Sequence, residues 1–131
     1  MPVRSLNSCI LRWPDSHAVE DSLRQWVEKI VKHRSGLLLI GYFGSLARGD
    51  WGVGSDLDLI VVVEASNLPF ERRAAEWDTT ELPVPVDLLV YTKEEWQSLS
   101  KRKRFGEILM REAIWVYERE RTDTQGDASQ P

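Results

Sequence analysis

The sequence predicts an α/β domain in which helices flank a mixed, mainly buried β-sheet. Apolar residues recur at steps of three and four positions from Val19 to Val31, which is typical of an amphipathic helix. Two runs without polar alternation, at 37–43 and 57–63, are typical of strands buried on both faces. A chain of 131 residues, of which 42% are hydrophobic, can form one such domain with its own core.

Local signals give the order and limits of the elements. We expect a helix from Asp15 or Ser16 to Gly36, a strand at 37–43, a short helix within Gly44–Gly49, a strand at 56–63, a helix from Pro69 to near Thr79, a strand at 86–91, a helix from Thr92 to Leu109 and a strand at 114–117. Thr92 and Glu95 have the spacing of a capping box, in which each side chain binds the other residue's backbone N–H. We expect the helix that begins there to continue past the basic run Lys101–Arg104.

Composition and charge exclude several function classes. The chain has 17 basic and 21 acidic residues and a net charge of -4, so no general positive field is available for DNA binding. Its longest apolar stretches are far shorter than the ~20 residues that cross a bilayer, so we expect no membrane span. The single Cys9 cannot form an internal disulfide, and no signal peptide is recognisable, which favours a cytoplasmic location.

The two ends of the chain differ from its centre. Met1–Trp13 is interpreted as an arm with a short strand, and residues 119–131 as a polar, mobile tail, which leaves residues 1–118 as the domain. Homo-oligomer formation stays open, because six tryptophans permit an apolar interface without locating it.

Three aspartates form a candidate metal site. Asp56 and Asp58 leave the start of a strand on the same face, roughly 7 Å apart along the backbone. If the strand at 86–91 lies beside it, Asp87 comes within about 5 Å. Carboxylates in an otherwise apolar sheet repel one another, and hard oxygen ligands suit Mg²⁺ shared with substrate phosphates. The alternative for Asp56 and Asp58 is a solvated turn, and for Asp87 an exposed strand residue.

Gly44 and Ser45 form a candidate phosphate site. Gly44 permits close approach of the backbone, and Ser45 offers a hydroxyl and a backbone donor where a helix begins. Arg48, one turn further on, can add a fork of N–H donors, although it can equally pair with Asp50 on the surface. Phosphates and metal at one place support displacement at phosphorus.

These residues carry a family resemblance. Gly44-Ser45, ten intervening residues and Asp56-Leu57-Asp58, with Asp87 on a later strand, resemble the signature of the polymerase-beta-type nucleotidyltransferase superfamily. The version Gly44-Ser45-Leu46-Ala47-Arg48-Gly49 is most similar to the minimal nucleotidyltransferases, known as MNT or MntA-like proteins. The likeness covers Leu37–Tyr91 and implies the polymerase-beta-like fold, a mixed sheet flanked by helices.

The resemblance also implies an activity and roles for the site residues. Members transfer a nucleoside monophosphate from a triphosphate to a hydroxyl and release pyrophosphate. By this resemblance, Asp56 and Asp58 would hold two Mg²⁺ ions, and Asp87 would bind the catalytic metal and help to deprotonate the acceptor. Gly44 and Ser45 would hold the β- and γ-phosphates.

The MNT branch implies a partner. Its members act as antitoxins to a helical HEPN toxin, and some add AMP from ATP to a tyrosine of the toxin. The small size of this chain supports an acceptor that arrives on another chain. Two alternatives stay open: a non-catalytic antitoxin that binds nucleotide and neutralises its partner by covering it, or nucleotidyl transfer to a small hydroxylated antibiotic. The nucleobase is not identified by any short motif.

Two further features favour structural interpretations. Lys101–Arg104 is more typical of a solvated helix face than of a partner or RNA contact. Trp51, beside the glycine-rich loop, is more typical of packing than of base stacking.

Overall fold

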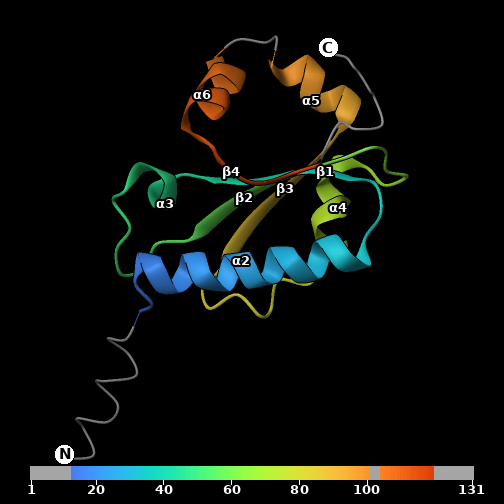
Figure 1. The fold of residues 1–131 in the computed structure, drawn as a ribbon. Helices are drawn as coiled ribbons and strands as arrows, with labels where there is room; N and C mark the ends of the chain where they lie inside the picture. Colours follow the sequence, from blue (N-terminus) through green and yellow to red (C-terminus); the bar gives the residue numbers. More distant parts are fainter. Residues whose placement is uncertain (1–12, 101–103, 120–131) are drawn as a thin grey trace, which may run out of the picture.

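The computed structural model describes residues 13–100 and 104–119, which form a four-stranded mixed sheet with helices on both faces (Figure 1). The strands are β1 (Leu37–Phe43), β2 (Leu57–Val63), β3 (Val86–Thr92) and β4 (Ile114–Glu118), in the order β3-β2-β1-β4. β1 is antiparallel to β2 and to β4, and β2 is parallel to β3. The mixed, helix-flanked sheet predicted from the sequence is confirmed.

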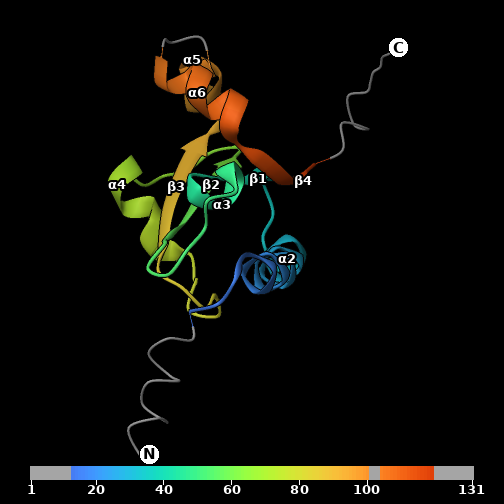
Figure 2. The same ribbon diagram turned by 90° about the vertical axis from the view of Figure 1, so that its left-hand side faces the viewer.

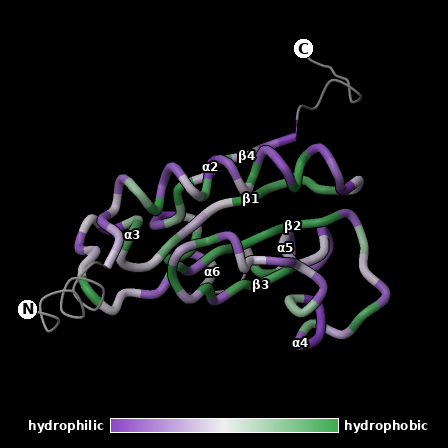
Figure 3. The backbone as a smooth tube through the Cα atoms, turned by 90° about the horizontal axis from the view of Figure 1, so that it is seen from below, coloured by the Kyte–Doolittle hydropathy of each residue, from purple (hydrophilic) through white to green (hydrophobic). Residues whose placement is uncertain are grey.

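Helix α2 (Ser16–His33) covers one face of the sheet. Its N-cap is Asp15, one of the two caps that the sequence allowed, and the Asp15 carboxylate accepts a hydrogen bond of 2.9 Å from the backbone N–H of Ala18. The helix buries an apolar stripe against alternate residues of β2. These core residues include Val19, Leu23, Trp26, Leu57, Leu59 and Val61. In Figure 3, hydrophilic and hydrophobic colours alternate along α2, whereas most of β2 is hydrophobic.

Two helices, α5 (Lys93–Ser100) and α6 (Arg104–Glu112), cover the other face (Figure 2). Ile60 and Val62 of β2 point to this side and pack with Leu109, which is 1% exposed. The single helix predicted from Thr92 to Leu109 is therefore wrong. A continuous helix over residues 93–112 would be about 30 Å long and would carry Leu109 away from the sheet, whereas two helices each place apolar residues on it.

The segment between β2 and β3 contains a shorter helix than predicted. Helix α4 (Phe70–Arg73) passes into the 3₁₀ helix η1 (Ala74–Glu76), and the chain is extended at Trp77. Trp77 leaves the helix to pack against Trp26, with ring centroids 6.4 Å apart. Asp78 then accepts hydrogen bonds from the backbone and hydroxyl of Thr80, and these local bonds compete with a helix that would reach Thr79.

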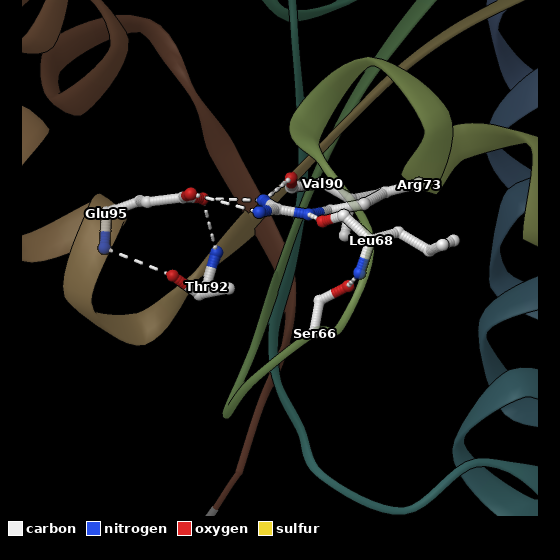
Figure 4. Close-up of polar contacts among 6 residues, drawn as sticks. All are labelled: Ser66, Leu68, Arg73, Val90, Thr92 and Glu95. Carbon is white, nitrogen blue, oxygen red and sulfur yellow. Dashed lines mark hydrogen bonds and ion pairs between the residues drawn. The ribbon is translucent and has the colours of Figure 1, made fainter.

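A buried arginine ties α4 to β3 and α5 (Figure 4). The Thr92 N–H donates to the Glu95 carboxylate at 3.0 Å, and the Glu95 N–H donates to the Thr92 hydroxyl at 3.3 Å, which confirms the capping box. Arg73 donates to the same carboxylate at 2.6 and 3.0 Å. It also donates to the carbonyl oxygens of Leu68 and Val90. These contacts use four of the five N–H donors of the buried guanidinium.

Three sequence interpretations fall outside the described residues. They concern the arm before Trp13, most of the basic run Lys101–Arg104, and the tail from residue 120 onward. At the last described position, the backbone of Arg119 donates to the Leu38 carbonyl oxygen at 2.9 Å. Among the described helices, none is long and apolar enough to span a membrane.

Candidate active site

The sheet topology brings three distant segments to one end of the molecule. β1 ends at Phe43, and the antiparallel register places Phe43 opposite Asp58 at the start of β2. The parallel register of β2 and β3 places Asp58 opposite Asp87. The turn that begins at Gly44 and the two strand starts therefore meet at the same end of the sheet.

Asp58 and Asp87 lie on the same face of the sheet. Along β2, Asp58 shares its side with Ile60, which packs beneath α6, and along β3 Asp87 shares its side with Leu89 of the same cluster. Asp56 precedes β2 by one residue, is exposed, and lines the same cavity as Asp58. The structure thus gathers the three sequence-predicted aspartates at the end of the face that α5 and α6 cover.

The electrostatics of Asp58 follow from this arrangement. Burial, followed by the charges of Asp87 and Asp56, raises the pKa of Asp58 above the usual range of an aspartate. Arg48 acts in the opposite direction, and Glu112 adds to the increase. Asp58 is therefore a partly buried carboxylate surrounded mainly by negative charge. Among the described groups that act on it, only Arg48 stabilises its ionised form.

Gly44 fits against Asp58. Its backbone has φ 76° and ψ -150°, a region occupied almost only by glycine, and it is the N-cap of the short helix α3 (Ser45–Arg48). A Cβ atom built at Gly44 would overlap the Asp58 carboxylate and would lie 3.2 Å from its Cγ. The absence of a side chain at Gly44 is thus what allows the turn and the carboxylate to approach each other.

The resulting cavity has a volume of about 450 Å³ and contains five of the six predicted site residues. Its lining residues are Phe43, Gly44, Ser45, Arg48, Asp56, Asp58, Ile108, Leu109 and Glu112. Asp87 is not part of the lining, although it is adjacent to Asp58 in the sheet. The contributions of α6, and of Glu112 in particular, were not predicted, because no spacing motif connects them to the earlier residues.

Arg48 connects α3 to α6 across this cavity. Its Nη1 donates to the Glu112 carboxylate at 3.0 Å, and its Nε donates to Asp50 at 3.4 Å. The surface pairing with Asp50, which the sequence left as an alternative to phosphate binding, is present. Arg48 nevertheless lines the cavity, so both arrangements are compatible with the structure.

The loop before β2 is held by packing and by its own hydrogen bonds. Trp51 donates from Nε1 to the Pro14 carbonyl oxygen at 2.9 Å and packs against the core beneath α2. Ser55 closes the turn, since its hydroxyl accepts from the Gly52 N–H at 3.0 Å. The packing interpretation of Trp51 is thus supported. These contacts hold the loop that precedes Asp56, which lines the cavity.

The donor set of the cavity fits a hard divalent cation. Among residues 13–100 and 104–119, no group of three or more acidic, histidine or cysteine side chains is placed to hold a metal ion, so Asp56, Asp58 and Asp87 do not form a three-carboxylate metal site by themselves. Mg²⁺ does not require one, because it is usually held by one or two carboxylates, several waters and substrate phosphates. Asp56 and Asp58 supply such carboxylates, and a bound cation would offset the repulsion that Asp58 experiences from Asp87 and Asp56.

A larger cavity of about 640 Å³ lies at the opposite end of β2, and its lining includes Val63, Trp77 and Val90. The arginines that line it are engaged: Arg73 pairs with Glu95, and Arg34 stacks on Trp77 at 3.7 Å from the ring centroid. None of the predicted site residues reaches it. The smaller cavity therefore remains the candidate active site.

The chain matches a known protein family over most of its length. A sequence model of the nucleotidyltransferase domain matches residues 24–116. The chain belongs to the nucleotidyltransferase domain family. The family match covers β1, β2 and β3 and reaches into β4, so every element that forms the cavity of this nucleotidyltransferase lies within it. A search of curated proteins gives no match.

Solved structures share the fold of this nucleotidyltransferase. A Sulfolobus solfataricus protein assigned as a nucleotidyltransferase has a TM-score of 0.59 and 19% identity, over 85% of this chain and 95% of that one. A toxin-antitoxin crystallised with AMP-PNP has a TM-score of 0.51 and 19% identity, over 76% of this chain and 77% of that one. At this identity the likeness shows the fold. The predicted resemblance to nucleotidyltransferases is confirmed by the family match, and members of the family generally use a nucleoside triphosphate and a divalent metal.

Proposed function

We propose that this nucleotidyltransferase transfers AMP from ATP to a hydroxyl group on a protein partner, and that the partner is a HEPN-type toxin which it neutralises as an antitoxin. The proposal depends most on one observation: Gly44 is in contact with the carboxylate of Asp58, which is the register partner of Asp87. This juxtaposition places a candidate phosphate site beside candidate metal-binding carboxylates.

The site residues have distinct proposed roles. Asp56 and Asp58 hold Mg²⁺, with two ions in the complete site, and Asp87 adds a third carboxylate from the neighbouring strand. Gly44 and Ser45 contact the β- and γ-phosphates, because they line the cavity next to Asp58. Arg48 supplies additional N–H donors to the same phosphates. When bound, Mg²⁺ neutralises charge on the phosphate oxygens and aligns the reacting groups.

The proposed reaction is a displacement at the α-phosphorus. The acceptor oxygen forms a bond to the α-phosphorus while the bond between that phosphorus and the oxygen of the β-phosphate breaks. Pyrophosphate leaves with the bonding electrons, and the proton of the acceptor hydroxyl passes to the carboxylate of Asp87. The protein contributes a fixed position for the phosphates and a base on the adjacent strand.

A protein acceptor is supported by the shape of the site. The cavity of about 450 Å³ is open to solvent, and Ile108 at its edge is 49% exposed. The fold is also shared with the toxin-antitoxin that was crystallised with AMP-PNP, which supports a nucleotide-dependent antitoxin. We place the transferase domain at residues 1–118 and the protein in the cytoplasm.

Label transfer tests this function. The chain is incubated with α-³²P-ATP, MgCl₂ and the candidate HEPN partner, and label on the partner is measured after denaturing electrophoresis. We expect labelling by the wild type and its loss in Asp56→Asn and Asp58→Asn. The matched control is Asp21→Asn, an exposed aspartate on α2 whose side chain is 72% accessible, and it should label normally.

The outcomes separate the alternatives. Labelling that persists in Asp58→Asn would reject the proposed site. Full neutralisation of the toxin by Asp58→Asn, without labelling, would favour an antitoxin that acts by binding. Labelling of small hydroxylated antibiotics in the absence of any protein would favour the antibiotic alternative.

A further inference from the structure

The contact between Arg48 of α3 and Glu112 of α6 assigns a role to a residue that no motif indicates. The Arg48 guanidinium carries five N–H donors. Among the described residues it uses two of them: Nε–H donates to Asp50, and one Nη1–H donates to Glu112. Three donors remain, which is enough for a bidentate contact with phosphate while both carboxylates stay bound.

The two carboxylates that hold Arg48 are not equivalent. The Glu112 side chain is 19% exposed, whereas that of Asp50 is 63% exposed. Glu112 is the last residue of α6, and this helix is fixed to the sheet by Leu109, which is 1% exposed. The N–H of Ala113 closes the helix end by donating to the Leu109 carbonyl oxygen at 2.9 Å. Glu112 is therefore the firmly placed partner of Arg48.

The charge distribution sets a second condition. The cavity is lined by the carboxylates of Asp56, Asp58 and Glu112, and by one described cation, Arg48. A further carboxylate beside a triphosphate site weakens nucleotide binding through repulsion, unless it is neutralised where it stands. The 3.0 Å contact neutralises Glu112 and at the same time fixes the guanidinium at the cavity.

We propose that Glu112 is a positioning residue, which orients the guanidinium of Arg48 so that its remaining N–H groups serve the phosphates of the bound nucleotide. This inference rests on the proposed function. The opposite possibility is that Glu112 competes with phosphate for Arg48, and that arrangement would give the reverse effect on affinity.

Isothermal titration calorimetry with AMP-PNP in MgCl₂ tests the inference. Glu112→Ala should weaken binding about three- to tenfold, because the guanidinium loses its fixed orientation. Glu112→Gln, which keeps an acceptor for Nη1–H, should weaken it less. The matched control is Glu107→Ala on the exposed side of α6, whose affinity should change by less than about twofold.

A double-mutant cycle separates positioning from a general structural role. If Glu112 acts through Arg48, Arg48→Ala with Glu112→Ala should bind AMP-PNP no more weakly than Arg48→Ala alone. Additive losses would overturn the inference, as would unchanged or tighter binding by Glu112→Ala. Absence of AMP-PNP binding by the wild type would reject the proposed function and this inference together. Binding by the wild type that is lost in Asp58→Asn and unaffected in Glu112→Ala would reject this inference alone.

Discussion

The backbone of Gly44 lies directly against the carboxylate of Asp58, so that no side chain fits between the turn after β1 and the start of β2. Two independent constraints meet at this glycine. Its φ of 76° with ψ -150° is a conformation that other residues avoid, and its missing Cβ leaves room for the carboxylate. The contact therefore connects backbone geometry with the chemistry of the site.

Gly44→Ala should be both destabilising and inactive. Backbone strain costs about 1–3 kcal/mol, and overlap with Asp58 adds a cost of similar size. We expect a loss of about 2–6 kcal/mol in the free energy of unfolding, measured by urea denaturation, together with loss of label transfer. Gly49→Ala is the matched control: Gly49 has φ 85°, and apart from Gly49 itself and its two chain neighbours no residue comes within 4 Å of the position that an alanine methyl group would take, so it should lose only about 1–2 kcal/mol. Equal losses in the two variants would contradict a steric role for Asp58.

Asp58→Asn should stabilise the metal-free protein while removing its function. The substitution removes a carboxylate whose ionised form is disfavoured by burial and then by the charges of Asp87 and Asp56. We expect a gain of about 0.5 kcal/mol at neutral pH in EDTA, kept small because solvent screens the half-exposed group. Addition of MgCl₂ with AMP-PNP should raise the melting temperature of the wild type and leave that of the variant unchanged. A lower melting temperature for Asp58→Asn in EDTA would show that its carboxylate is not electrostatically strained.

Glu95 should contribute to stability in a pH-dependent manner. The hydrogen bond from Arg73 is the main cause that holds the pKa of Glu95 below its usual range. Because the folded-state pKa is the lower one, this contribution is complete above the ordinary glutamate pKa of about 4.3 and is lost as the pH falls through the folded value. Glu95→Gln should cost about 1 kcal/mol at pH 7, a value reduced because the side chain is 42% exposed.

The pH dependence is measured by urea denaturation between pH 7 and pH 3. Glu95→Gln should lose less stability than the wild type over the acidic part of this range. Glu94→Gln, an exposed neighbour on the same helix, should follow the wild type. Parallel curves for the wild type and Glu95→Gln would refute the contribution of the Arg73 contact.

Gly41 should tolerate no side chain while Trp115 is present. A Cβ at Gly41 would lie 2.8 Å from the indole Cζ3 of Trp115, so Gly41→Ala should cost about 1–3 kcal/mol in the free energy of unfolding. In the Trp115→Leu background, the same substitution should cost much less, because the ring is no longer there. An equal cost in both backgrounds would show that the indole ring is not the cause. The clash would then be with the backbone of β4, because the Cβ atom would also lie 3.0 Å from the Ile114 carbonyl oxygen.

Several features of the fold were predictable because they are encoded locally. The stripe of α2 and its Asp15 cap follow from helical spacing, and the capping box at Thr92 follows from a four-residue pattern. The helix after Thr92 was predicted too long, because periodicity does not reveal that α5 and α6 return to the same sheet face. The helix after Pro69 was also predicted too long, because the burial of Trp77 against Trp26 is a long-range contact.

By itself, the sequence determined the parts of the site that are close along the chain. Only ten residues separate the Gly44-Ser45 pair from the Asp56-Leu57-Asp58 segment, so the spacing constrains how far apart the two can lie. Only the tertiary structure decided that Asp87 stands opposite Asp58 and that Glu112 holds Arg48. The physical reason is that these pairs depend on the order of strands in the sheet and on the return of a distant helix. Neither the strand order nor that return leaves a periodic signal in the chain.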